Sequence, residues 1–285
     1  MLGRIKEILW GTPTAVIILL VGAYFTFALL RRGAFGKKSV VAAFRSYGSG
    51  GSDGISPFSS LATALGGTVG IGSITGVGIA LSVGGAGSML WFWLCGLLCG
   101  GIKYAEVVSA SCSRIRMNGV FVGGAMYSLK TDGHKTAALI FSVCGILASF
   151  GTGNMTQASA VGDVMAANGI PRTLSAALLS LLVAFAVFGG QKRIAGVSAA
   201  IVPAAGAVYL VLALFMLIRG AHELPRVFRD IFAAAFGLRQ AVGGTLGVSV
   251  SAAISVGLTR CIFSNEAGMG TSPMAHSSAE SVLPS

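Results

Sequence analysis

Long apolar runs separated by short polar stretches dominate this chain. About 20 apolar residues are enough to cross a bilayer as an α-helix. By this criterion, predicted transmembrane helices cover residues 10–30, 57–82, 87–112, 136–161, 172–189, 194–218 and 240–264. The first run is too long for the core of a cleaved signal peptide, so we expect it to be retained. The pattern predicts an all-α integral membrane protein that forms one transmembrane domain over residues 1–285.

A further stretch, residues 223–237, predicts a helix of a different kind. A helical repeat places Phe228, Ile231 and Phe232 on one face, while Arg226 and Arg229 fall largely on the other. A segment of this kind is typical of an amphipathic helix that lies in the membrane interface.

Composition narrows the class of protein further. Of the 285 residues 54% are hydrophobic and 10% are charged, and the mean hydropathy is +0.83; a soluble domain carries about a quarter charged residues. The net charge of +11 comes mainly from basic residues that flank apolar runs, with no basic stripe interleaved with aromatics, so nucleic-acid binding is not expected. Cys95 and Cys99 sit among apolar neighbours and are interpreted as small buried hydrophobes.

Basic residues also orient the chain. Lys and Arg concentrate in the loops after the first, third and fifth predicted spans, which lie on one side of the membrane in a seven-span topology. The positive-inside rule assigns that side to the cytoplasm of a multi-pass cell-membrane protein. No nucleophile–base set or phosphate-binding loop points to an enzyme, and no cofactor is expected.

The second predicted span contains an unusual glycine cluster, GGTVGIGSITG, over residues 66–76. Glycine inside a helix costs about 1 kcal/mol relative to alanine, so the cluster favours a break at membrane depth. Backbone freed by such a break must face protein or a water-filled cavity. The alternative is a close helix-packing face, with Gly72 and Gly76 as a GxxxG motif.

The seventh predicted span ends in RCIFSNEAGMGTSPMAHS, residues 260–277. Ionisable groups within a span indicate a functional site, and here Glu266 is followed by Gly268, Gly270 and Pro273. Either this helix ends at the interface, or it breaks and resumes with Met274 beyond the break.

Two glycine-interrupted spans in corresponding positions indicate a transporter built from inverted repeats. With residues 10–30 as an extra N-terminal helix, residues 57–218 form a first five-helix repeat and residues 240–285 begin a second.

The fourth span adds FGTGNMTQAS, residues 150–159, in which Asn154 and Gln157 share a helical face. In the third span, Lys103 and Glu106 are expected to pair with each other.

These segments resemble the alanine or glycine:cation symporter family, the sodium:alanine symporters, and follow the family's order over nearly the whole chain. The matching stretches are SPFSSLATALGGTVGIGSITGVGIALSVGGAGS (56–88), IKYAEVVSA (102–110), GGAMYSL (123–129), FGTGNMTQAS (150–159), GGQKRIAGVSAAIVP (189–203) and FSNEAGMGTSPMAHSSAE (263–280).

The resemblance implies a leucine-transporter-like fold of the APC superfamily and sodium-driven import of a small neutral amino acid, alanine or glycine. Na⁺ would be the coupling ion, with Thr68 and Gly70 as candidate ligands. The substrate-binding residues that the resemblance implies lie at the two breaks and on the fourth span: Thr68, Gly70, Gly72, Ser73, Asn154, Gln157, Asn265, Glu266, Gly268 and Thr271.

The chain departs from the family pattern in several places. The family usually has Asn where this chain has Ser73 and Ser159, and Pro where it has Ala86 and Ala125. Family members run roughly half as long again, so most of a second repeat is not in this sequence. A truncated symporter is therefore expected. The alternative is a half-transporter that acts as a membrane assembly or regulatory partner, through self-association or with a second polypeptide that supplies further helices.

Overall fold

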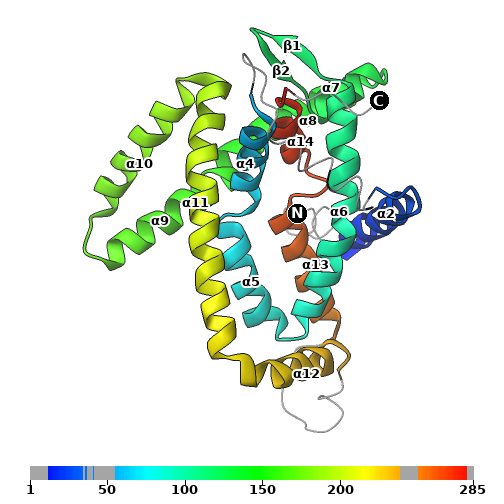
Figure 1. Cartoon of the computed structure of the whole chain (residues 1–285), viewed down its shortest axis with the longest axis vertical. Helices are drawn as coiled ribbons and strands as arrows, with labels where there is room; N and C mark the ends of the chain where they lie inside the picture. Colours follow the sequence, from blue (N-terminus) through cyan, green and yellow to red (C-terminus); the bar gives the residue numbers. More distant parts are fainter. Residues whose placement is uncertain (1–11, 35, 37–40, 42–54, 238–249, 281–285) are drawn as a thin grey trace, which may run out of the picture. The chain divides into compact units, whose positions relative to one another are not determined.

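The computed structural model describes residues 12–34, 36, 41, 55–237 and 250–280 (Figure 1). Apart from one short hairpin, the regular structure of this part is helical. Its helices are α2 (Thr12–Arg31), α4 (Pro57–Thr68), α5 (Ile71–Gly84), α6 (Ser88–Cys112), α7 (Ala125–Thr131), α8 (Lys135–Ala148), α9 (Met155–Ala167), α10 (Arg172–Val187), α11 (Gly190–Arg219), α12 (Leu224–Ala235), α13 (Val250–Asn265) and α14 (Thr271–Ser277).

Five stretches of these helices are long and apolar enough to cross a membrane: Pro13–Arg31, Pro57–Gly84, Ser88–Cys112, Lys135–Ala167 and Gly190–Arg219. They match five of the seven predicted spans. The fifth predicted span is α10, which has 16 residues and is shorter than each of these five stretches. Residues 240–249, where the seventh was expected to begin, lie outside the described residues. The amphipathic helix expected over 223–237 is α12, in which Ile231 and Ala235 are buried.

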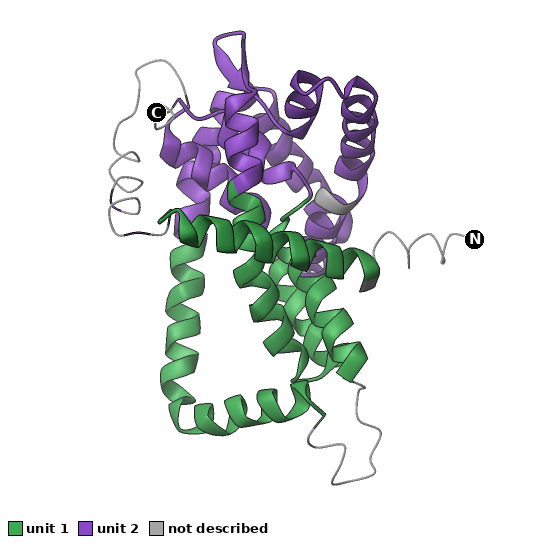
Figure 2. Cartoon of the chain, turned by 90° about the vertical axis from the view of Figure 1, so that its right-hand side faces the viewer, with its two compact units in different colours: residues 1–35, 73–104, 206–268 green, residues 36–72, 105–205, 269–285 purple. Residues whose placement is uncertain are grey.

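The chain divides into two compact units (Figure 2). The first contains residues 1–35, 73–104 and 206–268, and the second contains residues 36–72, 105–205 and 269–285. Two of the boundaries between the units coincide with the predicted breaks. One lies between Gly72 and Ser73, in the first glycine-rich segment, and the other lies between Gly268 and Met269, in the second.

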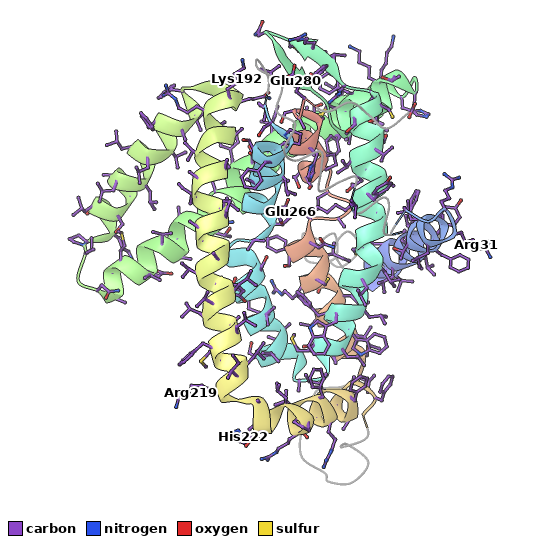
Figure 3. The ribbon with its side chains drawn as sticks, in the orientation of Figure 1. Arg31, Lys192, Arg219, His222, Glu266 and Glu280 are labelled. Atoms are coloured by element: carbon purple, nitrogen blue, oxygen red, sulfur yellow. The ribbon has the colours of Figure 1, made fainter. Side chains whose placement is uncertain are left out.

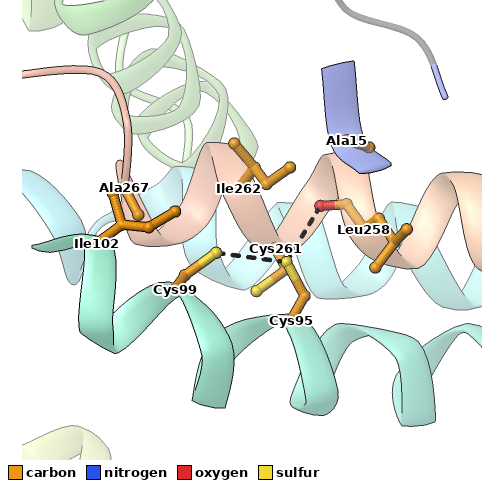
Figure 4. Packing of buried hydrophobic residues seen from close by; sticks show 8 residues of the cluster. All are labelled: Ala15, Cys95, Cys99, Ile102, Leu258, Cys261, Ile262 and Ala267. Carbon is orange, nitrogen blue, oxygen red and sulfur yellow. Dashed lines mark hydrogen bonds between the residues drawn. The ribbon is translucent and has the colours of Figure 1, made fainter. Parts of the chain in front are cut away.

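The first unit is held together by close contacts of α2, α6 and α13. Figure 4 shows the core cluster, which these helices and the segment after α13 supply: Ala15, Cys95, Cys99, Ile102, Leu258, Cys261, Ile262 and Ala267. Burial of Cys95 and Cys99 confirms their interpretation as core residues. Glycine lets two helix backbones approach, because a Cβ added at Gly101 would lie 2.5 Å from the Thr26 nitrogen.

In the second unit, α14 packs against α4, and α8 packs against α7. The hydroxyl of Ser60 on α4 donates to the Ala275 carbonyl oxygen on α14 over 2.7 Å. Just outside both helices, the amide of Glu280 donates to the Ile55 carbonyl oxygen over 2.9 Å. These two hydrogen bonds, with a bridge between Ile55 and Ala279, hold α14 beside α4.

The predicted all-α class misses one feature, a two-stranded antiparallel hairpin of β1 (Ile115–Met117) and β2 (Val120–Val122). Asn118 and Gly119 form its turn, with φ angles of 50° and 79°. An Asn-Gly pair adopts left-handed φ at low cost and favours a tight hairpin turn. The leucine-transporter-like arrangement and the repeat boundaries 57–218 and 240–285 stay predictions.

Candidate functional site

The first glycine-rich segment interrupts a helix. α4 ends at Thr68, Val69 and Gly70 are not helical, and α5 begins at Ile71. The Thr68 hydroxyl donates to the Ala64 carbonyl oxygen over 3.2 Å, and the Val69 amide donates to the Leu65 carbonyl oxygen over 2.6 Å. These bonds close the last turn of α4, and the helix is interrupted at Val69 and Gly70. The predicted break is therefore confirmed.

Gln157 from α9 lies directly against this break, within the second unit. A Cβ added at Gly70 would lie 2.9 Å from Gln157 Nε2 and 3.2 Å from its Oε1. Glycine at position 70 thus allows the side-chain amide to approach the main chain where it leaves the helix. Asn154, the other predicted residue of this segment, is exposed where a π-helical turn, Ser149–Gly153, passes into α9. Single π-helical turns occur frequently at functional sites.

The second predicted break is also confirmed. α13 ends at Asn265, residues 266–270 are not helical, and a new helix begins at Thr271 (Figure 3). Glu266, Gly268 and Gly270 have φ angles of 54°, 81° and 73°. Left-handed φ is cheap for glycine and costs a residue with a Cβ roughly 1–2 kcal/mol. Glu266 adopts this strained conformation although it carries a Cβ, and strain of this kind is often found at functional sites.

In the first unit, the start of α5 lies beside the end of α13. The Ser264 hydroxyl donates to Ser73 Oγ over 2.9 Å. At the far end of α5, a Cβ added at Gly84 would lie 3.2 Å from Val256 Cβ, so the two helices run antiparallel. The partly positive amino end of α5 is thereby placed next to the partly negative carboxyl end of α13. Opposite partial charges side by side suit a zwitterionic ligand.

Lys103 from α6 meets the same end of α13. Its Nζ donates to the carbonyl oxygen of Asn265 over 3.0 Å, in a partly buried position of the first unit. A cation is favourable at a helix carboxyl end, where the last carbonyls have no partner within the helix. The predicted pairing of Lys103 with Glu106 stays a prediction.

In the second unit, Arg114 bonds to the carboxyl end of α14 and to the segment just after it. One guanidinium nitrogen donates to the carbonyl oxygens of Ser277 and Ala279, at 3.4 and 2.7 Å. The guanidinium carbon also stands 4.1 Å from the centre of the Phe121 ring. Burial lowers the pKa of Arg114 from its ordinary value. Arg114 therefore fixes the end of α14 to the hairpin that follows α6.

The predicted site residues fall into two groups. Ser73, Asn265, Glu266 and Gly268 belong to the first unit, and Thr68, Gly70, Gly72, Asn154, Gln157 and Thr271 belong to the second. Within the units the structure joins Gly70 with Gln157, and Ser73 with the end of α13. The site as a whole stays a prediction.

Sequence reasoning missed Ser264 and Ser272 near the breaks, and it did not foresee the contact of Lys103 with Asn265. Ser264 and Lys103 make the contacts just described, and the hydroxyl of Ser272 is buried with no hydrogen-bond partner among the described residues. A buried hydroxyl without a partner costs about 1–3 kcal/mol, so Ser272 is a further candidate for a polar contact. The charge of Lys103 inside a span already indicated an unusual position, but the sequence does not show that its partner is Asn265.

Comparison with known proteins gives relatives along the whole chain. It is 34% identical over 281 residues to YrbD of Bacillus subtilis, a putative sodium/proton-dependent alanine carrier protein. It is 32% identical over 296 residues to AgcS of Methanococcus maripaludis, a sodium/alanine symporter. It is 33% identical over 286 residues to GlnT of Bacillus subtilis, a probable sodium/glutamine symporter.

These alignments cover 97%, 100% and 99% of this chain but 56%, 64% and 59% of YrbD, AgcS and GlnT. The chain thus spans somewhat over half the length of the curated relatives it matches. A model of the sodium:alanine symporter family matches residues 1–285. Together with the apolar helices, this match indicates a multi-pass protein of the cell membrane. The chain belongs to the sodium:alanine symporter family.

Proposed function

We propose that the protein takes part in sodium-coupled symport of a small neutral amino acid, alanine or glycine, into the cell. The observation that carries this proposal is the contact between Ser73 and Ser264, which sets the amino end of α5 beside the carboxyl end of α13. The substrate carboxylate would accept hydrogen bonds from the amide and the hydroxyl of Ser73, near the amino end of α5. Its ammonium group would donate to carbonyls in the last turn of α13 other than that of Asn265, which accepts from Lys103.

The break after α4 supplies the second set of groups in this proposal. Carbonyl oxygens leave the helix ladder at Thr68 and Gly70, and hard cations such as Na⁺ prefer oxygen ligands. The Thr68 hydroxyl donates to Ala64, and an oxygen that donates in this way can still act as a ligand through its lone pairs. Thr68 and Gly70 are thus proposed ligands of Na⁺, and Gln157 a proposed substrate contact.

The proposed substrate is alanine or glycine rather than glutamine. The Gln157 amide lies within contact distance of any Cβ at position 70, so Gly70 and Gln157 are close enough to contact the same small ligand. AgcS and YrbD, named for alanine, support this choice, while the name of GlnT makes glutamine the competing substrate to test.

The test is uptake of labelled alanine, glycine and glutamine into proteoliposomes that contain the purified chain. Each amino acid is offered with an inward Na⁺ gradient, an inward proton gradient, or neither. We expect alanine or glycine uptake that requires the Na⁺ gradient. Uptake driven only by protons, or greater uptake of glutamine, would contradict the proposed ion or substrate.

Two variants connect uptake with the site. Gln157→Leu removes the amide beside Gly70 and should lower uptake at least about tenfold, in keeping with a lost buried polar contact. Gln191→Leu makes the same change at an exposed position of α11 and should leave uptake unchanged. If a folded preparation takes up none of the three amino acids, the proposal is wrong for this chain, and the half-transporter predicted from sequence becomes the better explanation.

A further inference from the structure

A groove of about 270 Å³ lies between α7 and α8, wholly within the second unit. It is distinct from both helix breaks. Both helices line this groove. α7 contributes Met126, Tyr127 and Lys130, and the first two turns of α8 contribute Lys135, Ala138 and Leu139.

The turn between the two helices places both lysines at one end of the groove. Lys130 lies in the last turn of α7, and Lys135 is the first residue of α8. Gly133 adopts a φ of 87°, and the amide of His134 donates to the Leu129 carbonyl oxygen over 2.8 Å. This pattern closes α7 and reverses the chain at once. The two ammonium groups therefore flank the same mouth.

The wall becomes apolar along α8 away from the lysines. Ala138 and Leu139 follow Lys135 by three and four residues, so they share its helical face one turn further on. That turn leads into the candidate span Lys135–Ala167. The groove thus has a basic end at the head of a membrane-spanning helix and an apolar wall that continues toward the bilayer interior.

Charge and size favour one kind of ligand. Asp132 is the acidic residue of the turn, and with the two lysines it leaves a net positive charge that matches a phosphodiester. Lysine donates several hydrogen bonds to phosphate oxygens. The volume is just below the roughly 300–1,000 Å³ of pockets that enclose whole small ligands, so it suits a headgroup. The apolar wall would contribute nothing to a free phosphate ion.

We propose that this groove binds the headgroup of an anionic phospholipid. Lys130 and Lys135 hold the phosphate, and the first carbons of an acyl chain lie along Ala138 and Leu139. Tyr127 presents its ring at the polar boundary, as tyrosines at membrane interfaces do. The site lies on the side that the basic loops assign to the cytoplasm, where anionic lipids attract lysines. Lipid binding at this groove does not depend on the transport function.

The test is native mass spectrometry of the purified full chain in detergent, with equal amounts of phosphatidylglycerol and phosphatidylcholine. We expect retention of phosphatidylglycerol over phosphatidylcholine. Each lysine near an anionic headgroup is worth roughly fivefold in affinity, so the Lys130→Gln/Lys135→Gln variant should retain about twenty-five-fold less phosphatidylglycerol. Both lysines are exposed, so the variant should unfold at the same temperature as the wild type.

The matched control is Lys192→Gln/Arg219→Gln, which removes two exposed positive charges from α11. It should retain phosphatidylglycerol like the wild type. Equal loss in both variants would show only non-specific attraction and would overturn the proposal. Displacement of the lipid by excess glycerol 3-phosphate would also overturn it, because the site would then recognise phosphate without an acyl chain.

Discussion

The Nζ of Lys103 donates to the main-chain carbonyl of Asn265 over 3.0 Å and so joins α6 to the last residue of α13. Asn265 immediately precedes Glu266, where the chain takes a left-handed turn. The ammonium group compensates the negative end of α13 at the point where the helix hydrogen bonds stop. Lys103 therefore stabilises the geometry from which the second break starts.

Lys103→Met should lower the free energy of unfolding by about 1.5–3 kcal/mol, the range for hydrogen bonds to charged groups. Lys103→Arg keeps the charge and should recover part of this loss. Denaturant titration in mixed micelles measures both. A Lys103→Met protein as stable as the wild type would show that the carbonyl end of α13 needs no cation.

Gly70→Ala should raise the alanine concentration needed for half-maximal uptake by about tenfold. The added Cβ would meet the end of the Gln157 side chain at 2.9 Å, and that side chain can move without disturbing the helices. Stability should thus change little while substrate contact is lost. Gly76→Ala is the control, since among the described residues no atom outside the backbone of its own helix lies within 4 Å of a Cβ at that position. Equal uptake by both variants would rule out a role for the Gly70–Gln157 contact.

Glu266→Gly should be more stable than Glu266→Ala by roughly 1 kcal/mol, because glycine adopts a φ of 54° without the penalty that a Cβ brings. Both variants lack the carboxylate, so both should lose uptake if that group serves transport. Chemical unfolding of the two variants measures the cost of the backbone strain. Uptake by the same two variants measures the contribution of the carboxylate to transport. A stability order with alanine above glycine would mean that this backbone conformation is not kept in the membrane.

Gly101→Ala should destabilise the protein by about 1–3 kcal/mol, as overpacking does. The new methyl group would meet the Thr26 main chain at 2.5 Å, where α2 and α6 approach each other. The neighbouring Gly100→Ala places its methyl group in open space and should be neutral. Thermal unfolding of the two variants compares them directly. If both behave alike, α2 does not pack against α6 in this way.

Both helix breaks could be predicted because their cause is local: glycines that cost helix stability are clustered within a few residues of polar groups. The contacts that build the candidate site could not. Helical spacing places Lys103 near Glu106, but it contains no information about Asn265, which is 162 residues away. The contact of Gly70 with Gln157 depends in the same way on packing between distant helices. The hairpin was not predicted, although Asn118-Gly119 is a strong local turn signal. Its strands have three residues each, which is too short to give a recognisable pattern of apolar positions.

A tag inserted in that hairpin can be used to determine the orientation of the chain in the membrane. The Asn118-Gly119 turn is exposed and does not contribute to the groove or to the helix breaks. Exposed loop tips tolerate inserted segments, so a short epitope or a protease cleavage sequence placed between these two residues should leave the fold intact. In intact spheroplasts such a tag would be shielded from added antibody or protease, and in inverted vesicles it would be accessible. One insertion would therefore report on which side of the membrane the segment between α6 and α7 lies.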